Sequence, residues 1–167
     1  MKYDDVYLYS RDIDWFCIIG GVFCHVASAG GLLPDVVNDK EKLRDIQKRV
    51  FDMDYIFRND EIYINREYLY QRFGNNLESR EAYLSSFIQM SRKGFVSLDR
   101  TNVMDITDQT YHVVCFPNYY FEHQHLVHQP EWITELNLLD LPQTDGRILE
   151  NSLFNIHLLI FFNKQNP

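Results

Sequence analysis

A pair of glycines near the start of the chain constrains its fold more than any other feature. Gly20 and Gly21 lie between two apolar runs, residues 15–19 and 22–27, that are rich in β-branched and aromatic side chains. Paired glycines readily adopt the positive φ angles of a two-residue hairpin turn, so the two runs are expected to pair as antiparallel strands. The remaining expectations about this end of the chain follow from that turn.

Counting outward from the turn places Cys17 directly opposite Cys24. Residues opposed in this way have Cα atoms about 4.5–5.5 Å apart, which is within disulfide range. The chain has 3 cysteines, however, and begins without the basic and apolar segments of a secretory signal, so we expect a cytoplasmic protein with reduced thiols. A structural thiol pair is favoured over a redox or metal-binding role.

Two later segments have the periodicity of amphipathic helices. Over residues 39–53 apolar side chains recur at helical spacing, and Asn38 followed by Glu41 resembles a capping box. Residues 77–93 show a second apolar face and are followed by Gly94, a typical stop. Each helix therefore has one side that can cover a sheet.

The other β-rich runs are residues 55–58, 61–64, 95–98 and 111–116. The first two flank Asn59-Asp60 and are expected to form a second hairpin, whereas residues 66–73 suit either a short helix or a strand. Residues 131–139 favour a helix, and residues 153–162 suit a buried strand or a buried helix. The sequence thus predicts one α+β domain over residues 1–167, with a predominantly antiparallel sheet built from hairpins and the two main helices packed on one face.

Composition limits the classes of partner. The net charge is -8, and residues 101–167 hold 2 basic against 8 acidic side chains. Nucleic-acid binding depends on basic side chains that neutralise phosphates, so a nucleic-acid partner is not expected. No apolar run approaches the ~20 residues that span a bilayer, so no membrane segment is expected either. A basic protein partner is the better match.

The histidine-rich segment 122–128 is a candidate metal site. On a helix, Glu122, His125 and His128 would share a face and could supply three zinc ligands. A metal-assisted hydrolase using the region His123–His128 is therefore one hypothesis. The competing interpretation is a solvated polar surface, because no His-Glu-x-x-His pattern is present.

A second candidate site is the glycine-rich bend after the first hairpin. His25, Ser28, Gly30 and Gly31 combine an imidazole, a hydroxyl and exposed backbone, which could form the pocket of a small-molecule sensor. A tight bend that only links two elements is the alternative. Just before the hairpin, Asp12 and Asp14 lie two residues apart, so in an extended segment they would project from the same side and could hold a cation or act as acid and base. In a chain with 24 acidic residues, a solvated start of a strand is the favoured interpretation.

Taken together, these features favour a non-enzymatic binding or interaction domain over an enzyme. The chain is acidic and rich in aromatic residues, at 15% Phe, Trp and Tyr, and its motifs assemble no nucleophile, base and orienting group. A concrete form is an acidic inhibitor or immunity-type protein that covers a basic effector, with charge steering the association and tyrosines anchoring it. No cofactor is predicted, and the sequence does not indicate an oligomeric state.

Overall fold

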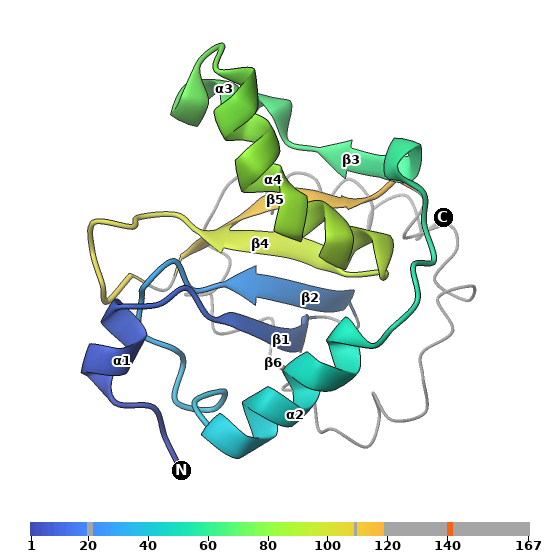
Figure 1. The fold of residues 1–167 in the computed structure, drawn as a ribbon. Helices are drawn as coiled ribbons and strands as arrows, with labels where there is room; N and C mark the ends of the chain where they lie inside the picture. The colour runs from blue at the N-terminus through green and yellow to red at the C-terminus, as the bar shows by residue number, and fades with distance from the viewer. Residues whose placement is uncertain (20–21, 109, 119–139, 142–167) are drawn as a thin grey trace, which may run out of the picture.

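The chain folds as an α+β protein in which helices accompany a mixed, mostly antiparallel sheet (Figure 1). This structure, a computed structural model, describes residues 1–19, 22–108, 110–118 and 140–141. The helices are α1 (Asp5–Tyr9), α2 (Lys40–Phe51), α3 (Arg66–Phe73) and α4 (Leu77–Arg92), with a 3-10 turn at Asn59–Glu61. The strands are β1 (Asp14–Ile19), β2 (Val22–Ala27), β3 (Ile62–Ile64), β4 (Val96–Arg100), β5 (Tyr111–Pro117) and β6 (Asp140–Leu141).

The first two strands pair as the glycine turn predicted. β1 and β2 are antiparallel, with Cys17 opposite Cys24 and Trp15 opposite Val26. Both thiols are free and buried, and burial together with the neighbouring Cys24 thiol raises the pKa of Cys17 well above its usual value. A protonated, buried thiol is a poor nucleophile and metal ligand, so the pair packs as part of the core.

The sheet as a whole is not a series of hairpins, which corrects one expectation. Its order is β3-β5-β4-β2-β1-β6. β2 pairs with β4 in parallel, and the chain between these two strands contains α2, α3 and α4. Local pattern could not reveal this pairing because a parallel neighbour requires a long crossover connection.

The expected hairpin around Asn59-Asp60 was wrong. Residues 55–58 form no strand, the Asn59–Glu61 segment is a 3-10 turn, and β3 pairs antiparallel with β5 instead. Glu61 accepts a hydrogen bond from the Arg58 backbone N–H at 2.8 Å, which closes a local turn. The pairing partner was therefore chosen by the fold rather than by sequence proximity.

The two long helices lie where periodicity placed them, but the cap of α2 differs from the prediction. Asp39 caps the helix by accepting from the backbone N–H groups of Glu41 and Lys42. Asn38 instead accepts from the Tyr3 backbone N–H at 2.8 Å and donates to the Tyr3 carbonyl, so it fastens the N-terminal segment to α2. The ambiguous segment 66–73 is helix α3, capped by Asn65.

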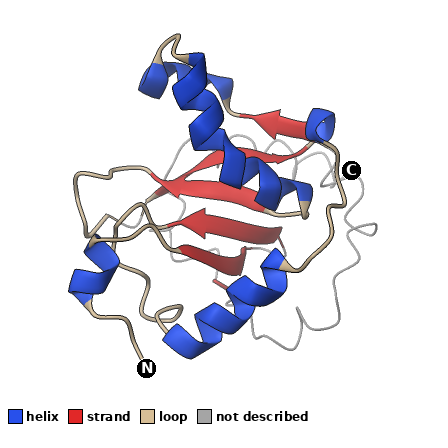
Figure 2. Cartoon of the chain, viewed as in Figure 1, coloured by secondary structure: helices blue, strands red, loops and turns tan. Residues whose placement is uncertain are grey.

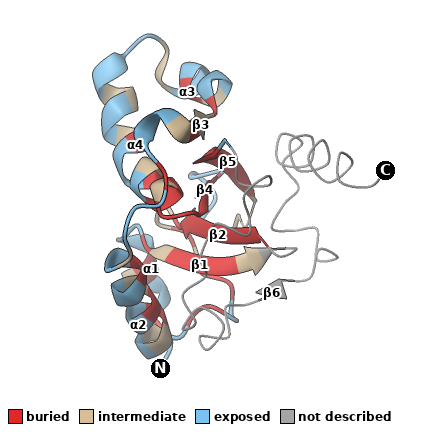
Figure 3. Cartoon of the chain, turned by 90° about the vertical axis from the view of Figure 1, so that its right-hand side faces the viewer, coloured by how far each residue is buried: buried red, intermediate tan, exposed pale blue. Residues whose placement is uncertain are grey.

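Side chains on the two faces of the sheet enter different clusters. On the face that carries α4, Phe16 and Phe23 pack with Ile46 and Val50 of α2 and with Met90 of α4. Trp15, Cys17 and Leu98 belong to a second cluster on the opposite face. Figure 2 shows the helices set against the sheet, and Figure 3 shows that the central strands are buried while the outer sides of α2 and α4 are exposed.

The predictions for residues 131–139 and 153–162 fall outside the described residues. In the part of the chain that is described, no helix combines the length and apolar character needed to cross a membrane.

Candidate functional site

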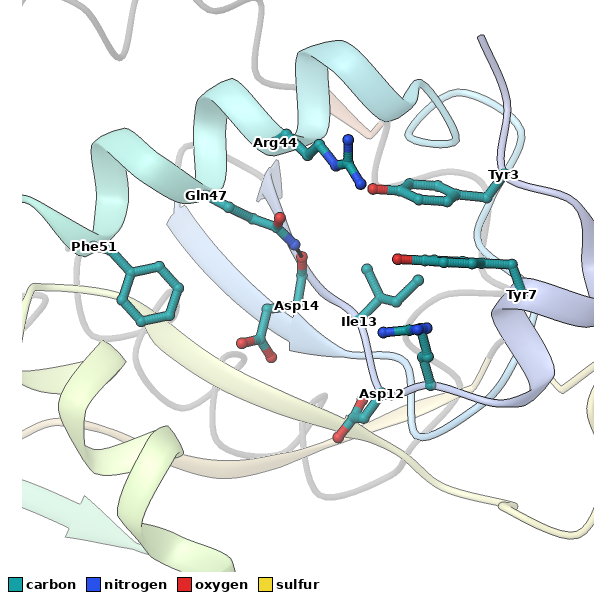
Figure 4. A pocket seen from close by; sticks show the side chains of 9 residues that line it. Tyr3, Tyr7, Asp12, Ile13, Asp14, Arg44, Gln47 and Phe51 are labelled. Atoms are coloured by element: carbon teal, nitrogen blue, oxygen red, sulfur yellow. Dashed lines mark hydrogen bonds between the residues drawn. The ribbon is translucent and has the colours of Figure 1, made fainter.

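A cavity of about 380 Å³ opens between the N-terminal segment with α1, the start of β1, and α2 (Figure 4). Its size falls in the range of small-ligand pockets, roughly 300–1,000 Å³. Its lining is mainly polar and carries two acidic and two basic side chains. The lining residues are Tyr3, Tyr7, Arg11, Asp12, Ile13, Asp14, Arg44, Gln47 and Phe51.

Two stacked tyrosines form one wall. Tyr3 and Tyr7 are one helical turn apart, and their rings lie 4.9 Å apart at an interplanar angle of 16°. The Arg11 guanidinium sits 4.6 Å from the centre of the Tyr7 ring, and Asn38 fixes the backbone of Tyr3. In Figure 4 both phenol hydroxyls point into the cavity. The wall is therefore a rigid aromatic surface with a polar edge.

Asp12 and Asp14 form the acidic side of the cavity. Each carboxylate uses Oδ1 to hold the fold: Asp12 accepts from the Ala29 backbone N–H at 2.7 Å, and Asp14 accepts from Nε2 of His25 at 3.0 Å. Neither Oδ2 has a hydrogen bond within the described residues. Each aspartate is thus oriented by one oxygen, while the other makes no hydrogen bond to a described residue.

A buried chain of polar side chains runs inward from Asp14. Nδ1 of His25 lies 3.3 Å from Oγ of Ser97, and Ser91 Oγ donates to Ser97 Oγ at 3.1 Å. Ser91 also lies 3.2 Å from the Cys115 thiol. Every member of this chain except Asp14 is buried, so the chain anchors Asp14 to the core through satisfied hydrogen bonds.

The order aspartate, histidine, serine is the arrangement used by serine hydrolases, but its surroundings here differ. Ser97 is fully buried and does not line the cavity. Its hydroxyl donates a hydrogen bond to the Phe87 carbonyl at 3.0 Å. The cavity lining contains no thiol, imidazole, serine or threonine. The cavity is lined instead by carboxylates, guanidinium groups, phenols and an amide, together with Ile13 and Phe51.

The structure separates the residues predicted at the glycine bend. His25 is buried on the helix-covered face beside Asp14, whereas Ser28 accepts from the Ile13 backbone N–H at 2.8 Å. Gly30 has a φ of 72°, and Gly31 lies so close to the side chain of Arg100 that a Cβ atom would be 2.6 Å from Cζ. None of the four residues lines the cavity, although His25 and Ser28 both contact its aspartates.

The predicted metal ligands Glu122, His125 and His128 lie outside the described residues. Among the residues that the structure describes, no three His, Cys, Asp or Glu side chains gather as a metal site.

A second polar cluster lies farther along the same face of the sheet. Asp99 accepts from the Tyr83 hydroxyl at 2.7 Å and from Arg72 at 3.2 Å. Burial raises the pKa of Asp99 despite these partners. His112 stacks on Tyr68 with ring centres 3.7 Å apart, and burial lowers the pKa of its imidazole to about 3.

Sequence reasoning singled out Asp12 and Asp14 but missed the rest of the cavity. The stacking of Tyr3 on Tyr7 gave no local helical signal, because Tyr3 precedes α1 and only Tyr7 lies within it. Arg44 gave no local signal, because its position on the cavity wall depends on how α2 packs against β1.

Fold and cavity together define an α+β protein with a polar cavity of mixed charge. Comparisons with protein-family models, with curated proteins and with solved structures find no match to this chain.

Proposed function

We propose that this chain is a non-enzymatic binding protein for a basic protein partner, and that the cavity receives a cationic side chain of that partner. The observation that carries the proposal is the state of Asp12 and Asp14. Each holds its position through Oδ1 and leaves Oδ2 without a partner among the described residues. A bound cation would give each free Oδ2 atom a partner without moving either carboxylate.

Anchored carboxylates favour binding because little has to be reordered when the ligand arrives. The hydroxyl edges of Tyr3 and Tyr7 add hydrogen-bond acceptors beside the two aspartates. Tyrosine is enriched among the residues that carry most of the energy of protein interfaces, and a guanidinium or ammonium group fits an edge of phenol and carboxylate oxygens.

The charge of the whole chain supports the same partner class. A net charge of -8 accelerates association with a basic protein and opposes approach to nucleic acid. An acidic inhibitor or immunity-type protein that covers a basic effector is the biological form that these properties favour.

The test measures binding of fluorescently labelled hexa-arginine amide to the full chain by fluorescence anisotropy at low salt. Asp12→Asn combined with Asp14→Asn removes both charges, while the amide oxygen can still accept the bonds from Ala29 and His25. We expect the double variant to bind at least tenfold more weakly, since losing about 1.4 kcal/mol of binding energy is a tenfold change.

The matched control changes two exposed acids away from the cavity, Asp54→Asn with Glu81→Gln. It alters net charge by the same amount, so its affinity reports the general electrostatic contribution. Equal losses in the two double variants would contradict the proposal, as would hexa-arginine binding that neither variant weakens.

A further inference from the structure

The cavity carries positive as well as negative side chains, and the positive ones narrow the ligand class. We infer that the cavity recognises the carboxy-terminal residue of its partner when that residue is arginine or lysine. Asp12 and Asp14 bind the cationic group of its side chain, and Arg44 binds its terminal carboxylate. This inference rests on the proposed function, because it names the part of the partner that enters the cavity.

Arg44 is the reason for assigning a carboxylate. It lies on the exposed side of α2 and lines the cavity, yet its side chain makes no ion pair or hydrogen bond with any described residue. Arginine forms bidentate hydrogen bonds with carboxylates, and its planar group suits that role better than a point charge would. In Figure 4 its guanidinium lies near the Tyr3 hydroxyl, on the side away from Asp12 and Asp14.

The distribution of charge separates this ligand from two simpler ones. A basic side chain inside a polypeptide would satisfy the aspartates but would leave Arg44 facing a neutral backbone. A phosphate would suit Arg44 but would be repelled by the two carboxylates, because the cavity's other arginine, Arg11, sits over the Tyr7 ring and makes no ion pair with either aspartate. A residue with a cation at one end and a carboxylate at the other satisfies both sides.

The apolar part of the cavity also fits such a residue. Phe51 lines the cavity with an exposed ring, and Ile13 lies between the two aspartates in the chain. The aliphatic stem of lysine or arginine packs along apolar surface while its charged end stays polar. The cavity volume of about 380 Å³ accommodates one such residue rather than a long peptide segment.

The experiment compares two peptides that differ only at the terminus, acetyl-Gly-Gly-Arg with a free carboxylate and the same peptide as its amide, by isothermal titration calorimetry with the full chain. We expect the free acid to bind at least tenfold more tightly than the amide. Arg44→Gln should abolish that difference by weakening only the acid, whereas Lys48→Gln, an equal charge change on an exposed residue of the same helix, should preserve it.

Each result points to one conclusion. If acid and amide bind equally and both depend on Asp12 and Asp14, the terminal recognition is wrong and the proposed function stands. If neither peptide binds and hexa-arginine also fails to bind, the proposed function falls and this inference falls with it. An acid preference that survives in Arg44→Gln would overturn the role given to Arg44.

Discussion

Asp14 and Asp99 occupy the same row of the sheet on the same face, yet the fold surrounds them differently. Asp14 is opposite Ala27 on β2, and Ala27 is opposite Asp99 on β4. The side chain of Asp14 is 31% exposed and that of Asp99 is 4% exposed. The Asp14 carboxylate is therefore partly exposed at the cavity, while the Asp99 carboxylate is enclosed.

The difference comes from what packs over each aspartate. α3 and α4 place Arg72 and Tyr83 against Asp99, and the Arg100 backbone N–H donates to its other oxygen at 2.8 Å. Among the described residues the Asp14 carboxylate receives one donor, His25 of its own sheet, and Gln47 of α2 donates only to the Asp14 backbone carbonyl. α2 and the N-terminal segment leave a cavity beside this carboxylate. The same side chain is thus enclosed where helices close over it and partly exposed where they do not.

The largest expected effect comes from breaking the enclosed site. Asp99→Ala leaves the Tyr83 hydroxyl and the Arg72 guanidinium without their acceptor, and we expect it to lower the free energy of unfolding by about 3 kcal/mol. Asp14→Ala removes a single inward bond and should cost about 1 kcal/mol. Urea unfolding of both variants measures the contrast, and equal losses would show that the two sites are equally structural.

The enclosed cluster should also make the fold sensitive to acid. The pKa of His112 falls to about 3, below its usual value near 6.5, so between these values the unfolded chain binds a proton that the folded chain excludes. Stability is full above pH 6.5 and falls as the pH drops. The loss is about 2 kcal/mol between pH 7.5 and pH 5.

Asp99 acts in the opposite direction at lower pH. Burial raises its pKa above the usual 3.8, so its protonation favours the folded state once the pH falls into that range. The His112 effect is therefore measured above pH 5. Unfolding of His112→Phe, which keeps a ring against Tyr68, should show a shallower pH dependence than the natural chain, and an unchanged slope would remove His112 as the cause.

The support of Asp12 can be tested through the glycine bend. Arg100 is buried and donates to the Ala29 carbonyl at 2.7 Å, so it holds the segment whose Ala29 N–H orients Asp12. Gly31→Ala would push a methyl group into that guanidinium and should cost about 1.5 kcal/mol in thermal or urea unfolding. Gly74→Ala, where no atom lies within 4 Å of the added methyl, isolates the smaller cost of a positive φ.

The smallest effect on stability is expected at the cavity itself. Asp14→Asn keeps the acceptor for His25 and removes only the outward charge, so the free energy of unfolding should change by less than about 0.5 kcal/mol. The same variant should bind hexa-arginine amide more weakly. A large loss of stability would show that Asp14 has a structural role like that of Asp99 and would contradict a binding role for Asp14.

Sequence reasoning reached the elements whose information is local. The Gly20-Gly21 pair predicted the pairing and register of β1 and β2, and apolar periodicity predicted α2 and α4. The spacing of Asp12 and Asp14 predicted that their carboxylates would share one side. Sequence reasoning failed for β3, because its partner β5 lies some fifty residues away. It also failed for the predicted Asn38 cap, because the Asn38 side chain bonds to Tyr3 instead.

By itself, then, the sequence determined where α2 and α4 lie, how the first two strands align, and that the protein is acidic, because turn geometry, periodicity and charge are properties of neighbouring residues. Only the tertiary structure decided that β2 lies beside β4, that Tyr3 and Arg44 meet Asp12 and Asp14 around one cavity, and that Asp99 is closed while Asp14 is open. These outcomes depend on contacts between residues distant in the chain. Bringing distant residues together costs chain entropy, and that cost is offset only when the whole core assembles.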